Sequence, residues 1–422
     1  MKHEILKQII FEQRNIIKNA YIIDREYVFE QEANYILVGL RRAGKSTLLY
    51  KIVRDLVDGG KDWNQIIYIN FEDERLTEFT LNDFNDIVQT AGELTSEKSY
   101  YFLDEVQNIV GWEHFARRMA DAGERVYITG SNATMLSQEM AAKLGGRYWT
   151  KEIMPYNFKE YLDVLKVSHD EEAIYTAKMN GVIRANAKNY MKEGGLPETL
   201  NFLDKRSYVE NIYQKVLLGD IAGRYAIRNV QALRVLLKKI AETVTSEISF
   251  SKLSNSVNSV GFKCSKDSII SYVSYAKNAY LIFENKNYMA KFTEQESTPR
   301  FYFMDNGLIN LFLINKNSAL LENMVANCLK RKYGNSIYYF KSAKTGIDID
   351  FYIPDVNMAI QVTYTLNEGD MEREISSLNS LSKFENESVE KYMVVTYEDE
   401  ERMIQMDTIE IEVIPLYKFL LM

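Results

Sequence analysis

Residues 39–46, which spell GLRRAGKS, limit the folds open to this chain more than any other feature. They match the P-loop pattern G-x-x-x-x-G-K-[ST] in full. An apolar run at residues 35–38 comes directly before them, and a helical pattern at residues 47–53 follows. Because a P-loop needs a strand before it and a helix after it, this context predicts an α/β fold built around a phosphate-binding loop.

The loop residues have separate expected roles in binding a nucleoside triphosphate. Glycines let backbone N–H groups turn toward phosphate oxygens, and the new helix directs its positive end at the same anion. We expect Lys45 to reach the β- and γ-phosphates and the Ser46 hydroxyl to bind Mg²⁺. The predicted cofactors are therefore ATP and Mg²⁺; a chance glycine loop is the alternative. The residues predicted to bind the nucleotide are Gly39, Arg41, Arg42, Ala43, Gly44, Lys45, Ser46 and Thr47.

Three further short runs rich in β-branched and aromatic residues follow the P-loop, at residues 66–69, 100–103 and 126–129. Helical patterns separate these runs. Such alternation is typical of parallel strands covered by helices. We therefore expect residues 1–162 to form an α/β P-loop domain.

Two acidic residues, Asp104 and Glu105, stand at the end of the run at residues 100–103. An acid at the end of a neighbouring strand is the second requirement of a P-loop site. We expect Asp104 and Ser46 to hold the magnesium shell, and Glu105 to orient and deprotonate the attacking water. ATP hydrolysis is thus the predicted reaction.

Two more candidates for catalysis follow. Asn132 comes after the run at residues 126–129, where a polar side chain can touch the γ-phosphate or the attacking water; the alternative is that Ser131 and Asn132 cap a helix. Arg147 precedes another strand-like run. It is a candidate to stabilise charge on the transferring phosphoryl group, in cis or from a neighbouring subunit. The alternative is a structural or surface arginine.

Taken together, these residues resemble a widespread prokaryotic group of AAA-like P-loop ATPases. The resemblance is carried by residues 39–47, 102–107, 129–132, 146–147, 194–198, 322–323 and 347–351, with Tyr190, Asp220 and Arg224. It covers nearly the whole chain, and the double arginine of the P-loop is fairly specific. It implies an additional-strand, AAA-like ATPase core and a helical and winged-helix middle. It also implies a C-terminal domain of unknown function with a PD-(D/E)XK, restriction-nuclease-like α/β core.

Residues 163–300 are expected to form the helical and winged-helix region. The helical patterns lie at residues 230–244, 251–260 and 265–276, and the expected wing strands at residues 281–284 and 288–292. Residues 238–300 contain nine Lys or Arg and six Asp or Glu, a mildly basic balance. DNA is therefore a candidate partner, with Lys263, Lys266 and Lys277 as phosphate contacts. The alternative is a module that packs between the two larger domains.

Residues 301–422 are expected to form the nuclease-like domain. In folds of this type, an acid on a helix, an acid on a strand and an E/Q-x-K on the next strand meet at a metal ion. The matching positions here are Glu322, Asp350 and Gln361. Thr363 stands where lysine is expected, and Lys341 and Lys344 are candidates to replace that charge. We therefore expect a weak second metal site and little or no metal-dependent DNA cleavage.

Composition limits the location and partners of the chain. The formal net charge of −8 gives no global attraction to polyanions, and the two cysteines provide neither a disulfide framework nor a zinc site. No apolar run approaches the ~18–20 residues that span a bilayer, so we expect a cytoplasmic protein without a membrane partner. The predicted function is an ATPase whose nucleotide state controls the C-terminal half, with a homo-oligomer as a candidate assembly. A nucleotide-gated scaffold with little hydrolysis and an ATP-dependent nuclease are the alternatives.

Overall fold

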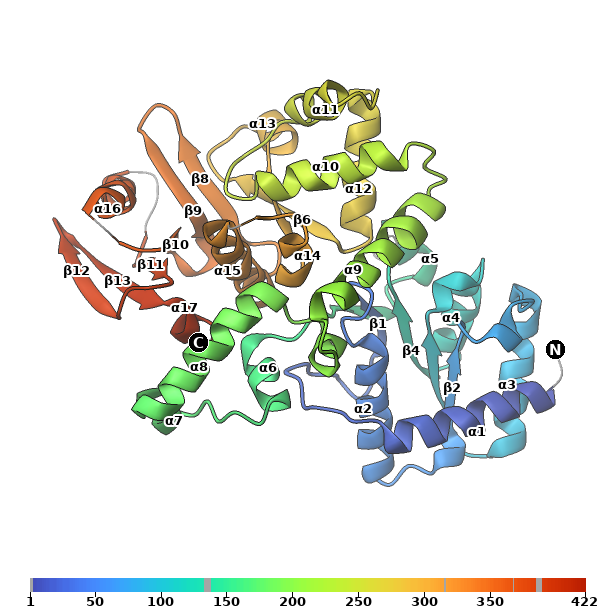
Figure 1. The fold of residues 1–422 in the computed structure, drawn as a ribbon. Coiled ribbons are helices and arrows are strands. Elements are labelled where there is room, and N and C mark those ends of the chain that lie inside the picture. The colour runs from blue at the N-terminus through green and yellow to red at the C-terminus, as the bar shows by residue number, and fades with distance from the viewer. Residues whose placement is uncertain (1–2, 133–137, 315, 367, 385–388) are drawn as a thin grey trace. The chain divides into compact units, whose positions relative to one another are not determined.

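The computed structural model describes residues 3–132, 138–314, 316–366, 368–384 and 389–422 (Figure 1). The chain divides into two compact units. The first unit consists of Met1–Met154 with Asn278–Tyr280, and the second of Pro155–Lys277 with Leu281–Met422. No helix in the described part of the chain is both long and apolar enough to cross a membrane.

The first unit contains a five-stranded sheet with the order β2-β3-β4-β1-β5. Its strands are β1 (Asn34–Val38), β2 (Ile66–Asn70), β3 (Tyr100–Asp104), β4 (Arg125–Gly130) and β5 (Tyr148–Glu152). Every neighbouring pair is parallel, as the apolar runs predicted. One additional strand, β4, lies between the P-loop strand β1 and the acid-bearing strand β3. The additional-strand P-loop topology expected from the sequence is therefore present.

Stacked aromatic rings cross this sheet from strand to strand. Tyr35 of β1 stacks on Tyr127 of β4, which stacks on Phe102 of β3, which stacks on Tyr68 of β2. All four side chains are buried. Such cross-strand pairs fix the register of a sheet, and here the register aligns the carboxyl ends of β1, β3 and β4. The helices of this unit are α1 (His3–Asn19), α2 (Lys45–Asp58), α3 (Phe84–Leu94), α4 (Trp112–Asp121) and α5 (Gln138–Leu144).

The second unit contains an eight-stranded mixed sheet with the order β12-β13-β11-β10-β9-β8-β6-β7. Its strands are β6 (Ile282–Asn287), β7 (Arg300–Phe303), β8 (Tyr338–Ser342), β9 (Ile347–Ile353), β10 (Met358–Thr363), β11 (Lys391–Thr396), β12 (Arg402–Met406) and β13 (Ile409–Pro415). The strands β8 to β10 form an antiparallel meander, and β10 then pairs in parallel with β11 after the crossover helix α16 (Glu368–Ser382). The sequence did not predict β7, β12 or β13.

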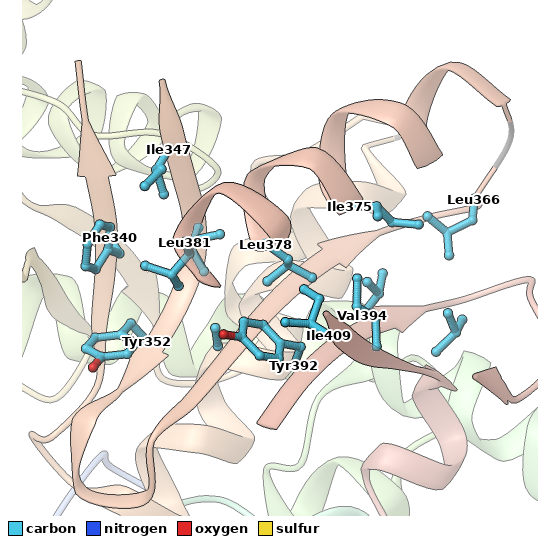
Figure 2. Packing of buried hydrophobic residues seen from close by; sticks show 14 residues of the cluster. Phe340, Ile347, Tyr352, Leu366, Ile375, Leu378, Leu381, Tyr392, Val394 and Ile409 are labelled. Carbon is cyan, nitrogen blue, oxygen red and sulfur yellow. The ribbon is translucent and has the colours of Figure 1, made fainter. Parts of the chain in front are cut away.

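Apolar side chains of α16 close one face of this sheet. Figure 2 shows Leu378 and Leu381 of α16 beside Tyr392 and Ile409 from the strands below. Both leucines are fully buried. The other helices of the second unit are α6 (Phe158–Val164), α7 (Glu171–Tyr175), α8 (Ala177–Glu193), α9 (Lys205–Lys215), α10 (Val230–Glu242), α11 (Phe250–Ser259), α12 (Lys266–Asn278), α13 (Phe292–Ser297), α14 (Asn306–Asn310), α15 (Asn317–Tyr333) and α17 (Leu416–Phe419).

The two compact units do not coincide with the three domains expected from the sequence, which stay a prediction. The division falls after Met154 instead of residue 162. The reason is that Phe158 and Tyr161 of α6 pack their rings on Tyr190 of α8, within the second unit. The expected boundary between residues 300 and 301 lies inside β7, which shares one sheet with the C-terminal strands.

The expected wing is also corrected. Helices α10, α11 and α12 occupy the predicted helical segments, but residues 288–292 form no strand. The partner of β6 is β7, because α13 occupies the segment between them. Both strands are largely buried in the large sheet, so they do not form an exposed wing.

Candidate functional site

The P-loop connects the carboxyl end of β1 to the start of α2 and has a tightly constrained backbone. A Cβ atom on Gly39 would lie 2.2 Å from the carbonyl oxygen of Ile153, so only glycine fits there. Arg42 and Gly44 both adopt left-handed conformations, with φ of 65° and 94°. Left-handed residues between right-handed ones turn successive N–H groups toward one concavity, which binds anions. The loop backbone is therefore shaped for phosphate, and Thr47 lies in the first turn of the helix that follows.

Lys45 is held inside this loop. Its ammonium donates hydrogen bonds to the carbonyl oxygens of Gly39 and Leu40, both at 3.1 Å. The Lys45 Nζ atom also lies 4.0 Å from Glu105 Oε1, and the lysine is only 4% exposed. A buried ammonium bonded to loop carbonyls can exchange those partners for phosphate oxygens without moving far. This placement fits the contact expected of Lys45.

Asp104 ends β3 at full burial and accepts hydrogen bonds from several side chains. Tyr68 Oη donates to its Oδ2 at 2.7 Å, and the Thr129 hydroxyl donates to its Oδ1. Ser46 also bonds to this carboxylate. Burial raises the pKa of Asp104, and the neighbouring charge of Glu105 raises it further. A divalent cation would reverse that trend, and a hydroxyl beside a carboxylate is the oxygen donor set that Mg²⁺ takes with a nucleotide.

Glu105 takes a left-handed conformation directly after the strand, with φ of 53°. Its backbone N–H donates to Thr129 Oγ1 at 2.9 Å, and the Gln107 amide donates to its Oε2. Thr129 therefore holds both Asp104 and the backbone of Glu105. The strained conformation directs the Glu105 side chain to Lys45 rather than to the next strand position.

Ser131 and Asn132 follow β4 at the same end of the strands as the P-loop, because Gly130 pairs with Val38 at the end of β1. Both are buried, and the Ser131 hydroxyl has no hydrogen-bond partner among the described residues. The capping alternative depends on residues 133–137, which lie outside the described residues. The location of Asn132 is consistent with its predicted contact, which stays a prediction.

Arg147 and the P-loop lie at opposite ends of the parallel strands. β5 runs parallel to β1 with Tyr148 beside Asn34, so Arg147 is at the amino ends of the strands. The two ends of a strand of five residues lie about 15 Å apart. The side chain pairs there with Asp121. The cis role considered for Arg147 is therefore wrong for this fold, and the role from a neighbouring subunit stays a prediction.

The sequence assigned no role to three further residues near the nucleotide site. Arg25 donates to the carbonyl oxygens of Ala43 at 3.0 Å and Met154 at 2.7 Å, and no local pattern marks it. Thr129 and Tyr68 hold Asp104 from neighbouring strands. Their positions toward the carboxyl ends of predicted strands could have identified them. Of the two P-loop arginines, Arg41 pairs with Glu72 at 2.9 Å, and Arg42 is exposed.

A buried arginine, Arg300 of β7, lies where the second metal site was expected. Its Nη1 donates to Asp350 Oδ1 at 3.0 Å, and its Nη2 to Asp348 Oδ1 at 2.9 Å. Nη1 also lies 3.7 Å from Glu322 Oε1 on α15, and Arg300 is only 2% exposed. We call Arg300 and these three acids the Arg300 cluster. Burial raises the pKa of Glu322 to about 8, with a further rise from Asp350 that Arg300 opposes.

The remaining predicted ligand, Gln361, is committed to the backbone of β9. Its Oε1 accepts from the Asp350 amide and its Nε2 donates to the Asp348 carbonyl, both at 2.8 Å. Among the described residues, no group of three or more His, Cys, Asp or Glu side chains is arranged to hold a metal. The structure does not gather Glu322, Asp350 and Gln361 around one open position: Arg300 lies between the two acids, and Gln361 bonds to the backbone of β9.

Lys341 and Lys344, the candidates to replace the charge missing at Thr363, differ in their surroundings. Lys341 Nζ reaches Asp348 Oδ2 at 3.0 Å and Glu247 Oε1 at 2.8 Å, so it borders the Arg300 cluster. Lys344 is exposed in the turn between β8 and β9. The Thr363 hydroxyl donates to the Thr365 carbonyl at 3.1 Å. A positive charge on β8 therefore borders these acids.

Comparison with known proteins supports the interpretation of the P-loop site. The model of the AAA domain matches residues 31–162, and a model of a domain of unknown function (DUF8612) matches residues 184–319. The uncharacterized protein MJ1544 of Methanocaldococcus jannaschii is 32% identical over 433 residues, covering 99% of this chain and 95% of that protein. An uncharacterized protein of Haemophilus influenzae is 30% identical over 342 residues, covering 79% of this chain and 83% of that protein.

Two solved structures are similar at a low level. The Walker-type ATPase PABY2304 of Pyrococcus abyssi has a TM-score of 0.40 and 13% identity, covering 73% of this chain and 95% of that one. AMPPCP-bound DnaA from Aquifex aeolicus has a TM-score of 0.27 and 14% identity, covering 64% and 88%. The sequence matches are the stronger finding. The chain belongs to the same family as MJ1544 of Methanocaldococcus jannaschii, and its residues 31–162 form an AAA-type, ATP-binding P-loop domain.

Proposed function

We propose that this protein is a Mg²⁺-dependent ATPase whose nucleotide state controls its second unit. The observation that carries the proposal is the grouping of Lys45, Glu105 and Asp104 at one edge of a parallel sheet, beside a loop shaped for phosphate. Bound Mg–ATP supplies the γ-phosphoryl group and the charge that Lys45 neutralises. Glu105 accepts the proton of the attacking water, and Asp104 and Ser46 position the ion. Thr129 fixes both acids relative to each other.

Control of the second unit is proposed to begin at Arg25. Its guanidinium joins the P-loop backbone at Ala43 to Met154, the last residue of the first unit's main segment. The next residues of the chain are then held within the second unit. The Tyr156 amide donates to the Gly195 carbonyl at 2.7 Å, and the Tyr190 hydroxyl donates to the Tyr156 carbonyl at 2.6 Å. A change in the P-loop on nucleotide binding can thus pass along the main chain to the loop at residues 194–197.

Hydrogen exchange tests this control. We expect saturating Mg–ATP to slow amide exchange at residues 153–157 and 194–197 in the wild-type protein, because the phosphate would fix the P-loop and, through Arg25, the connecting segment. Arg25→Gln should bind ATP yet lose most of the change at residues 194–197. Arg54→Gln is the matched control, since Arg54 bonds to carbonyls at the end of α1. Unchanged exchange in the second unit at saturating ATP would refute the proposed control.

Arg147 provides a second test, because only a neighbouring subunit can bring it to a P-loop. We expect Arg147→Ala to lower ATP turnover by about 10–100-fold at concentrations that allow assembly, since one charge-assisted contact contributes about 1.5–3 kcal/mol. Arg117→Ala should have little effect, although Arg117 also borders Asp121. Mixing Arg147→Ala with a Glu105→Gln variant should restore part of the activity. Equal loss at all protein concentrations, with no recovery on mixing, would contradict a role in trans.

The second unit is proposed to be an interaction domain of nuclease-like descent. The order α15-β8-β9-β10-α16-β11 and the two acids Glu322 and Asp350 support that descent. The Arg300 guanidinium between those acids argues against cleavage. DNA does not enter the proposal, since one expected phosphate contact, Lys277, pairs with Glu284 at 2.7 Å.

A further inference from the structure

The Arg300 cluster brings together more carboxyl groups than cations. Two elements, α15 and β9, contribute Glu322, Asp348 and Asp350. Arg300 lies between all three acids, and it stacks on the Tyr339 ring at 4.7 Å. Lys341 is shared between Asp348 and Glu247, so four carboxyl groups meet two cations. Acids at this density are expensive to bury without a centrally placed positive charge.

The Arg300 guanidinium does not pair with every polar group around it. Arg300 is a planar donor, and its buried Nε has no partner among the described residues. Asn285 is opposite Arg300 in the β6–β7 register, on the same face of the sheet. It is 1% exposed, and neither atom of its amide has a partner in the described structure. Cβ atoms of directly opposite residues lie about 4.5–5.5 Å apart, so the unpaired amide borders the cluster. One buried oxygen atom beside the cluster, Oδ1 of Asn285, is therefore left unsatisfied by the Arg300 guanidinium.

We propose that Arg300 occupies the position of a divalent cation, as a built-in substitute for it. The surrounding ligands are carboxylate and amide oxygens without a His or Cys, a set that favours hard ions such as Mg²⁺ and Mn²⁺. The wild-type second unit then binds no divalent ion at this cluster. Removing the guanidinium exposes a cation site formed by Glu322, Asp350 and Asp348. The ion-pair cluster thereby holds α15 against the sheet without metal.

Metal-dependent stability of Arg300→Gln tests this proposal. Without nucleotide, Mn²⁺ should raise the thermal unfolding midpoint of Arg300→Gln by several degrees and leave the wild type almost unchanged, because an ion that binds only the folded state stabilises it. KCl at equal ionic strength is the control for screening of surface charge. Adding Asp350→Asn to Arg300→Gln should abolish the Mn²⁺ response. Arg300→Lys keeps a cation in the cluster and should not respond either.

Two results would overturn the proposal. One is a folded Arg300→Gln protein that takes up no Mn²⁺ by electron paramagnetic resonance. The other is a wild type that binds Mn²⁺ as tightly as the variant does. If Arg300→Gln fails to fold, refolding from urea decides the matter. Recovery of structure only with Mn²⁺ supports the proposal, whereas failure both with and without Mn²⁺ refutes it.

Discussion

Replacing Glu105 with glutamine is expected to slow ATP turnover by ~10²–10⁴-fold, the usual contribution of one well-placed general base. Glutamine keeps the size of the side chain and can still accept from Gln107, but it cannot take a proton from water. The Glu105 backbone is held by Thr129, so the left-handed turn should persist in the variant. Because Lys45 and the P-loop are unaltered, ATP affinity should change little.

Single-turnover hydrolysis of Mg–ATP, measured beside equilibrium binding, separates these two effects. Glu97→Gln is a matched control, since it makes the same exchange at an exposed position of the first unit. If ATP turnover by Glu105→Gln falls only as far as its ATP affinity does, Glu105 supports binding and not proton transfer. A wild type that binds ATP but hydrolyses it no faster than Glu105→Gln would favour the nucleotide-gated scaffold considered from the sequence.

The first unit could be predicted largely from the sequence because its determinants are local. The P-loop occupies consecutive residues, and Asp104 follows its own apolar strand directly. The parallel strands are continuous apolar runs, and the pattern fixes both their type and their ends. Only pairing between distant strands was missing from the sequence. That pairing brings Thr129 to Asp104 and moves Arg147 away from the P-loop.

The second unit was less predictable because its strands depend on long-range pairing. β7 has only four residues, and the segment before it forms α13, so its pairing with β6 had no local signal. The consequence was large, since β7 carries Arg300 into a group of acids some 20–50 residues further on. The aspartates at alternate positions of β9 share a face, and both accept hydrogen bonds from Arg300. What they bind could not be deduced from β9 alone.

Lys45→Ala is expected to weaken Mg–ATP binding by about 10²–10⁴-fold, because the variant lacks the charge-assisted contacts of the ammonium with two phosphates, worth about 1.5–3 kcal/mol each. The fold should survive, since Lys45 bonds to carbonyls of its own loop and removing it takes a buried charge away. Lys51→Ala is a matched control on the same helix, where the ammonium pairs with Asp55 instead. Calorimetric titration with Mg–ATP, with circular dichroism of each variant, measures affinity and folding separately.

Equal affinity in folded wild type and Lys45→Ala would contradict the nucleotide site. A loss of affinity shared by Lys51→Ala would instead indicate damage to α2, because only Lys45 lies within the loop that approaches the phosphates.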